Sequence, residues 1–254
     1  MSNTCYMCSE KATSIEHVPP KCLFPKSKDN SGKKDYRYNL ITVPSCDLHN
    51  GGKSKDDEFL MVSLAGIFGN NSIGYEYYNG KIERALKRNS YRLLDRVFLK
   101  RKVVRIEKDN KFINFILGTP DYQRLIECFK HIALGLYRYH FNKNFIGTLH
   151  PHLAFLNSTE SNPKTFKKFV EHLATDELKN LDKFGSNPDV FFYQITPPDK
   201  FGIFMMRLCF YTNADIYVSF KSNLAAEPFD LGMALINSGI KTTIKHGGKS
   251  YEFN

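Results

Sequence analysis

Apolar positions recur at helical intervals in several parts of this chain. From Asp56 the run DDEFLMVSLAGIF is typical of a helix, with Ser54 and Asp57 at the spacing of a capping box. The following segment, GNNSIGYEYYNG, has the composition of a loop. Residues 81–101 then repeat apolar side chains at helical intervals and carry cations on the other faces, which predicts a basic amphipathic helix.

Strands and further helices are indicated beyond residue 101. The runs KVVRIEK and KFINFIL resemble paired strands separated by Asp109 and Asn110, and more β-rich runs lie in the last third of the chain. We expect strands at 102–108, 111–117, 190–196, 201–212 and 215–220, and helices at 121–141 and 163–184. The pattern therefore predicts a mixed α+β domain over residues 59–254.

Residues 1–58 lack long periodic patterns and are rich in Cys, Pro, Gly, Lys and Asp. Such a segment has too little apolar content to form a core by itself, as in small domains that a bound metal holds together. We expect a separate module here, and the fold class of the whole chain is then α+β.

The composition sets the broad class of protein. With 254 residues and 42% apolar content, the chain can bury a substantial core. The net charge of +10 favours contact with a polyanion such as nucleic acid. No run is long and apolar enough for a membrane helix, and the polar start MSNTCYMCSEK lacks the apolar core of a signal peptide. We therefore expect a cytoplasmic protein without membrane contact, whose cysteines bind metal rather than form disulfides.

The cysteine spacing near the N-terminus carries the clearest chemical signal. Cys5 and Cys8 form one pair, and after 37 residues Cys46 and His49 form a second. Two such pairs offer three thiolates and one imidazole to a tetrahedral zinc ion, which predicts a structural Zn²⁺ site. Cys22 is an alternative ligand, but no Cys or His is paired with it, so we expect it to be a buried thiol.

Polar residues of other kinds lie between and after these two pairs. Glu16 and His17 precede Val-Pro-Pro, Asn39 precedes Leu40, and Asn50 follows the last zinc ligand directly. This order of elements over residues 5 to 58 resembles the HNH endonuclease superfamily in its zinc-knuckle form. The resemblance implies a ββα-metal (treble-clef-like) fold in 1–58, in which a β-hairpin and a helix enclose a catalytic divalent ion.

The resemblance also implies a role for each of these residues. His17 would be the general base that takes a proton from the attacking water. Glu16 and Asn50 would bind the catalytic Mg²⁺ or Mn²⁺, and Asn39 would hold His17 in position through the backbone. Lys53 could reach a phosphate near the start of the next helix.

Two positions depart from the family pattern. His49 stands where a cysteine is more usual, and imidazole is an accepted zinc ligand. Glu16 stands where many members have aspartate, and its longer side chain changes the reach of the carboxylate. We expect Asp56, Asp57 and Glu58 to stabilise the dipole of the following helix rather than bind metal.

Three functions therefore remain open from the sequence. The first is a metal-dependent endonuclease that hydrolyses DNA, with RNA not excluded, and that acts in restriction or phage defence as the resemblance implies. The second is a zinc-knuckle module that binds nucleic acid without cleaving it. The third is an interaction protein whose 59–254 domain recruits a protein partner.

Overall fold

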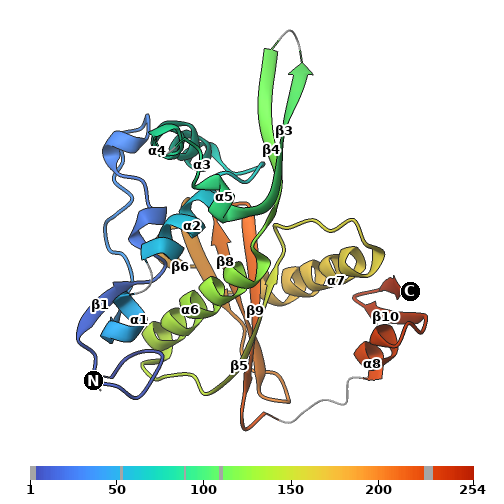
Figure 1. Ribbon diagram of the computed structural model, residues 1–254. Helices are drawn as coiled ribbons and strands as arrows, with labels where there is room; N and C mark the ends of the chain where they lie inside the picture. Colours follow the sequence, from blue (N-terminus) through green and yellow to red (C-terminus); the bar gives the residue numbers. More distant parts are fainter. Residues whose placement is uncertain (1–3, 52–53, 89, 109–110, 226–230) are drawn as a thin grey trace. The chain divides into compact units, whose positions relative to one another are not determined.

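The computed structural model describes the chain except for residues 1–3, 52–53, 89, 109–110 and 226–230. It has a mixed α+β fold that divides into two compact units, residues 1–144 and 145–254 (Figure 1). The boundary expected after residue 58 falls inside the first unit, because the helices that follow pack against the N-terminal segment. No helix among the described residues has both the length and the apolarity needed to cross a bilayer.

The first unit begins with a small antiparallel pair of strands and two helices. Strand β1 pairs with β2 so that Glu16 lies opposite Val43 and His17 opposite Thr42. The elements of this part are β1 (Ser14–His17), two short 3₁₀ helices (Lys21–Leu23 and Ser27–Asp29), β2 (Thr42–Ser45), α1 (Asp47–Gly51) and α2 (Ser54–Ala65). The helix expected from Asp56 is therefore present as α2, and its buried face carries Phe59, Leu60 and Leu64.

The region after α2 differs from both sequence predictions made for it. The expected loop contains a helix, because the Asn71 side chain accepts a hydrogen bond from the Gly74 amide and caps the turn. The expected single helix at 81–101 is broken, and Ser90 and Tyr91 both adopt left-handed backbone conformations at φ 48° and 59°. The observed elements are α3 (Ser72–Tyr77), a π-helical turn (Tyr78–Ile82), α4 (Glu83–Arg88) and α5 (Leu94–Val97).

A long hairpin and a long helix complete the first unit. Strands β3 (Phe98–Lys108) and β4 (Lys111–Pro120) pair with each other alone, which confirms the predicted strand pair. Helix α6 (Tyr122–Phe141) confirms the predicted helix and starts at Asp121, whose carboxylate accepts a hydrogen bond from the Arg124 amide.

Helix α6 packs against β2 and α2 with one apolar face. The buried residues of this face follow helical spacing and include Leu125, Phe129, Ile132 and Leu136. At its start, the Arg124 guanidinium donates to an Asp56 carboxylate oxygen at 2.8 Å. Helix α6 is therefore part of the core that supports the N-terminal segment.

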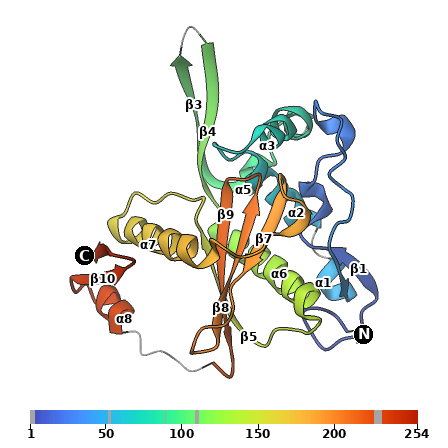
Figure 2. The same cartoon turned by 180° about the vertical axis from the view of Figure 1, so that it is seen from behind.

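The second unit is built on a five-stranded antiparallel sheet in the order β5-β9-β8-β7-β6 (Figure 2). Three of these strands match the predicted β-rich runs, and helix α7 packs on the sheet through a cluster that contains Ala174, Leu178 and Tyr217. The strands are β5 (Gly147–Leu153), β6 (Phe184–Asn187), β7 (Phe191–Ile195), β8 (Ile203–Phe210) and β9 (Ala214–Ser222), and α7 spans Ser161–Leu178.

The last part of the second unit was not predicted. Helix α8 (Leu231–Asn237) precedes a hairpin of β10 (Thr242–His246) and β11 (Lys249–Phe253). Ile236, Tyr251 and Phe253 form a small core there, against which Phe166 and Phe169 of α7 pack.

Gly135 of α6 provides a test of the packing between α6 and the segment after β1. A Cβ atom at this position would lie 2.7 and 2.9 Å from the two methyl groups of Val18, which is 2% exposed. We expect Gly135→Leu to lower the free energy of unfolding by about 1–3 kcal/mol through overpacking, as measured by urea denaturation. Gly51→Leu is the control, because a Cβ on Gly51 in α1 meets nothing within 4 Å; an equal loss there would contradict the packing argument.

Candidate metal centre and adjoining pocket

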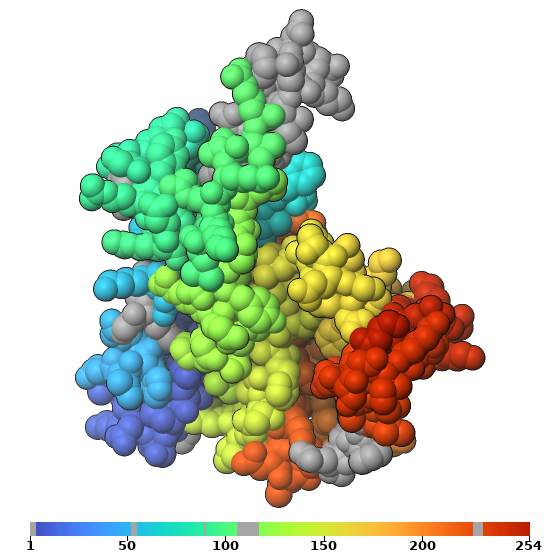
Figure 3. Space-filling model, turned by 45° about the vertical axis from the view of Figure 1, so that its right-hand side comes forward, coloured from blue at the N-terminus to red at the C-terminus, as the bar shows by residue number. Residues whose placement is uncertain are grey.

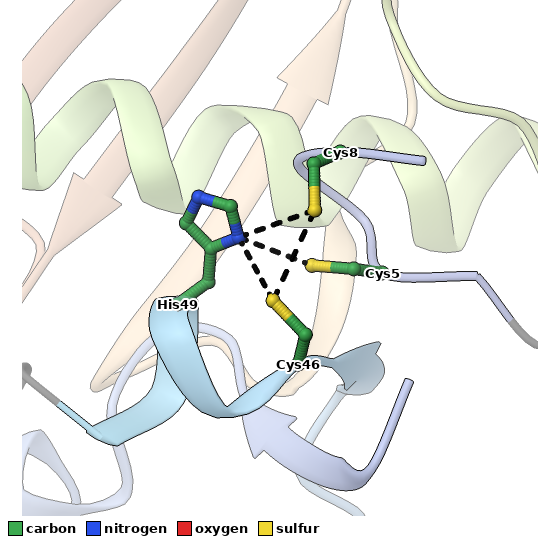
Figure 4. A group of neighbouring side chains, drawn as sticks. All are labelled: Cys5, Cys8, Cys46 and His49. Atoms are coloured by element: carbon green, nitrogen blue, oxygen red, sulfur yellow. Dashed lines mark hydrogen bonds between the residues drawn. The ribbon is translucent and has the colours of Figure 1, made fainter. Parts of the chain in front are cut away.

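The two predicted ligand pairs come together in the structure (Figure 4). The ligand atoms of Cys5, Cys8, Cys46 and His49 all lie within 4.8 Å of one another. The Nδ1 atom of His49 lies 3.4, 3.5 and 3.2 Å from the Sγ atoms of Cys5, Cys8 and Cys46. The Sγ atoms of Cys8 and Cys46 are 3.9 Å apart.

These distances fit a tetrahedral zinc ion. With Zn–S bonds of about 2.3 Å and Zn–N bonds of about 2.0 Å, the edges of the tetrahedron are about 3.8 Å between sulfurs and about 3.5 Å between sulfur and nitrogen. The cluster is therefore suited to a structural Zn²⁺. The prediction that these four residues come together is confirmed.

Backbone hydrogen bonds shape each half of the centre. The Cys5 amide donates to the Glu10 carbonyl at 2.8 Å, which closes the first knuckle, and the His49 amide donates to the Cys46 carbonyl at 3.1 Å, which starts α1. Burial raises the pKa of the Cys5 thiol, but backbone hydrogen bonds at Met7 and Cys46 and side-chain hydrogen bonds with His49 and Cys46 together outweigh it and lower the pKa to about 6. A thiol with such a pKa is largely thiolate at neutral pH, which is the form that binds zinc.

Cys22 is not part of this cluster. Its thiol donates a hydrogen bond to the Asp57 carbonyl at 3.2 Å, and burial raises its pKa to about 12. Cys22 is therefore not a ligand of the cluster, as expected, but its side chain is half-buried rather than fully buried.

Asn144 contacts the first knuckle from the end of α6, and sequence analysis missed it. Its side-chain amide donates to the Cys5 carbonyl at 2.8 Å and to the Cys8 carbonyl at 3.3 Å. Its amide oxygen in turn accepts a hydrogen bond from Arg138, which is 6% exposed. Since Asn144 lies 139 residues from Cys5, no local spacing could have indicated this contact.

A pocket of about 210 Å³ adjoins the metal centre in the first unit. The predicted residues Glu16, His17 and Asn50 line it together, and Asp57 of α2 joins them. The Asn50 amide donates to the Ser14 hydroxyl at 2.9 Å, which fixes its side chain beside β1. The structure thus brings three of the predicted site residues to one pocket.

Burial and nearby charges change the pKa of His17, and a buried hydroxyl contacts Glu16. Burial lowers the pKa of His17, and the charges of Lys21 and Arg37 lower it further. The buried hydroxyl of Tyr6 donates to a Glu16 carboxylate oxygen at 3.4 Å. Burial and these cations therefore favour the neutral His17 imidazole, which is the form able to accept a proton.

The other residues predicted for the site do not all lie in this pocket. Asn39 is exposed in a left-handed conformation at φ 47°, and among the described residues no hydrogen bond joins it to His17. Lys53 lies outside the described residues. Asp56 and Asp57 lie in the first turn of α2, as expected; Asp56 also forms an ion pair with Arg124 at 2.7 Å, and Asp57 also lines the pocket.

Comparison of the chain with protein-family models, with curated proteins and with solved structures finds no match.

The zinc assignment predicts that Cys46→Ser loses bound zinc. Removal of one thiolate weakens a site whose metal organises two segments, so the variant should also unfold at a lower temperature. Elemental analysis and a thermal melt measure both effects. Cys22→Ser should keep its zinc, and full zinc content in a folded Cys46→Ser protein would refute the ligand assignment.

The position of Asn144 predicts that its replacement weakens zinc binding. Groups that hold metal ligands in place typically affect metal affinity by about 10–100-fold, so Asn144→Ala should weaken zinc binding by that factor. Competition with a chelator of known affinity measures the change. Asn142→Gly is the control, since Asn142 is exposed and has φ 53°, which glycine adopts freely. Unchanged affinity in Asn144→Ala would show that the contact to the knuckle does not support the metal.

Proposed function

We propose that the first unit contains an HNH-type nuclease that hydrolyses phosphodiester bonds of DNA. The observation that carries this proposal is the pocket that Glu16, His17 and Asn50 line together, and Asn50 directly follows the cluster residue His49 in the chain. These residues come from β1 and α1, and the order of β1, β2 and α1 is that of a ββα-metal fold. The family pattern and the shared pocket thus support the same assignment.

His17 is the general base in this proposal. Phosphodiester hydrolysis needs a water molecule deprotonated in line with the leaving oxygen, and a neutral imidazole accepts that proton near pH 7. Burial and the charges of Lys21 and Arg37 favour the neutral form of His17. The same two cations would also attract the phosphate of a substrate.

Glu16 and Asn50 would hold the catalytic Mg²⁺ or Mn²⁺. A carboxylate and an amide oxygen are suitable ligands for these ions, which usually keep several waters and take further oxygens from the substrate phosphate. Asp57 in the same pocket adds a second carboxylate. When bound, such an ion neutralises negative charge on the scissile phosphate and on the leaving oxygen.

Several further roles remain predictions from the sequence. Orientation of His17 by Asn39 and phosphate binding by Lys53 remain predictions from the resemblance. A role in restriction or phage defence, a cytoplasmic location and recruitment of a partner by the second unit are expectations of the same kind.

Replacement of His17 tests the proposal. We expect the protein to nick or cut supercoiled plasmid with Mg²⁺ or Mn²⁺, and His17→Ala to be slower by about 10²–10⁴-fold, the usual contribution of a general base. His150→Ala is the control, because His150 is exposed on β5 of the second unit. Equal cleavage by His17→Ala would remove this residue from the mechanism, and inactive wild-type protein across metals and substrates would favour the non-catalytic binding module.

The pH profile of cleavage tests the base role separately. The rate should rise with pH as His17 loses its proton and then level off. Because the pKa of His17 lies below its ordinary value of about 6.5, the midpoint of this rise should lie below pH 6.5. A profile that still rises steeply above neutrality would indicate another base.

A further inference from the structure

The positive charge of the chain is concentrated between residues 81 and 105. The chain as a whole has a net charge of +10. This segment contains ten cationic side chains and only two acidic ones, Glu83 and Asp95. Most of the excess positive charge of the chain therefore lies here. The cations are Lys81, Arg84, Lys87, Arg88, Arg92, Arg96, Lys100, Arg101, Lys102 and Arg105.

The two acids are already used within the segment. Glu83 pairs with Lys87 at 2.9 Å, and Asp95 pairs with Arg101 at 2.7 Å. Other cations of the segment are exposed and have no carboxylate partner among the described residues: Arg88, Arg92, Arg96, Lys100 and Lys102. The segment therefore presents an uncompensated basic surface in the first unit.

The hairpin of β3 and β4 carries part of this surface away from its neighbours. Figure 3 shows its described part standing out from the helices of the first unit. Leu99, Val103 and Leu117 are 70%, 61% and 53% exposed, so apolar side chains lie in solvent beside the cationic ones. An isolated two-stranded hairpin is marginally stable in water, and a bound partner would supply the missing contacts.

We propose that the β3–β4 hairpin, together with α4 and α5, is a docking surface for duplex DNA, with the hairpin in the major groove. Charge complementarity selects a polyanion, and two copies of such a basic hairpin would repel each other. The 11 residues of β3 span about 36 Å at about 3.3 Å each. That length is comparable to one helical turn of DNA, about 34 Å, and a two-stranded ribbon fits the major groove, about 12 Å wide.

The side chains favour a duplex over a single strand. Proteins that bind single strands offer aromatic rings on which bases stack. Tyr91, between α4 and α5, is 38% exposed and offers one such ring, whereas the exposed side chains described on β3, including Leu99, Lys100 and Lys102, are cationic or aliphatic and suit phosphates, sugars and thymine methyl groups. This inference rests on the proposed nuclease function for its biological meaning, but the binding itself needs no catalysis.

Binding of a labelled duplex by the His17→Ala protein tests this surface without cleavage. Fluorescence anisotropy between about 50 and 200 mM salt gives the affinity and its salt dependence. Each phosphate contact contributes about 0.9 to the slope of log K against log salt, so adding Lys100→Ala and Lys102→Ala should reduce that slope by about 1.8. Both lysines are exposed, so the fold should be retained, and circular dichroism checks this.

The control pair is Lys245→Ala with Lys249→Ala. These lysines are also exposed and lie on the other two-stranded hairpin, β10–β11, in the second unit. The proposal predicts an unchanged slope for this pair. An equal reduction in both pairs would show non-specific attraction to total charge and would overturn the assignment of the hairpin.

Other outcomes separate this proposal from the nuclease assignment. Duplex binding that depends on Lys100 and Lys102 in a wild-type protein that cuts nothing would support the surface and reject the nuclease. Cleavage by the wild-type protein, together with undiminished duplex binding by the lysine variant, would support the nuclease and reject the docking surface. No duplex binding at all, or tighter binding to single strands, RNA or anionic vesicles than to duplex DNA, would overturn the docking surface.

Discussion

The packing of helix α6 against the N-terminal segment is the constraint on which the candidate site depends. The segment before residue 59 contains two knuckles, two short strands and several prolines, and these elements bury little surface by themselves. Helix α6 supplies an apolar face, and Gly135 allows Val18 to approach it closely. Because Val18 directly follows His17, this contact also limits where the candidate base can move.

Polar contacts fix the same helix at both of its ends. Near the start, Arg124 pairs with Asp56 and its guanidinium lies over the Phe59 ring at 4.2 Å, which positions the first turn of α2. Beyond the end, Asn144 holds two carbonyls of the first knuckle and is itself held by Arg138. The buried Arg138 charge is costly without partners, so its hydrogen bond to Asn144 favours one arrangement of helix and knuckle. Helix α6 and the polar contacts at its two ends thus hold both the cysteine-histidine cluster and the pocket in place.

Local signals in the sequence predicted the parts of the structure that depend on neighbours in the chain. Spacing identified the four cluster ligands, and the long helical run at 121–141 identified α6. The break in the predicted helix at 81–101 was missed because Ser90 and Tyr91 adopt left-handed conformations that their residue types do not favour. Asn144 and the pocket position of Asp57 were missed because both depend on packing between distant segments.

The charged groups of the first unit include both acids and cations around the pocket, and a separate basic segment at residues 81–105. Acidic and neutral ligands for a cation, Glu16, Asp57 and Asn50, line the pocket. Carboxylates alone would raise the pKa of a neighbouring histidine and keep it protonated at neutral pH. Burial and the cations Lys21 and Arg37 act on His17 in the opposite direction, and the net pKa is lowered. A histidine kept neutral beside two acids is suited to accept a proton from water, whereas a protonated one would serve only as another cation.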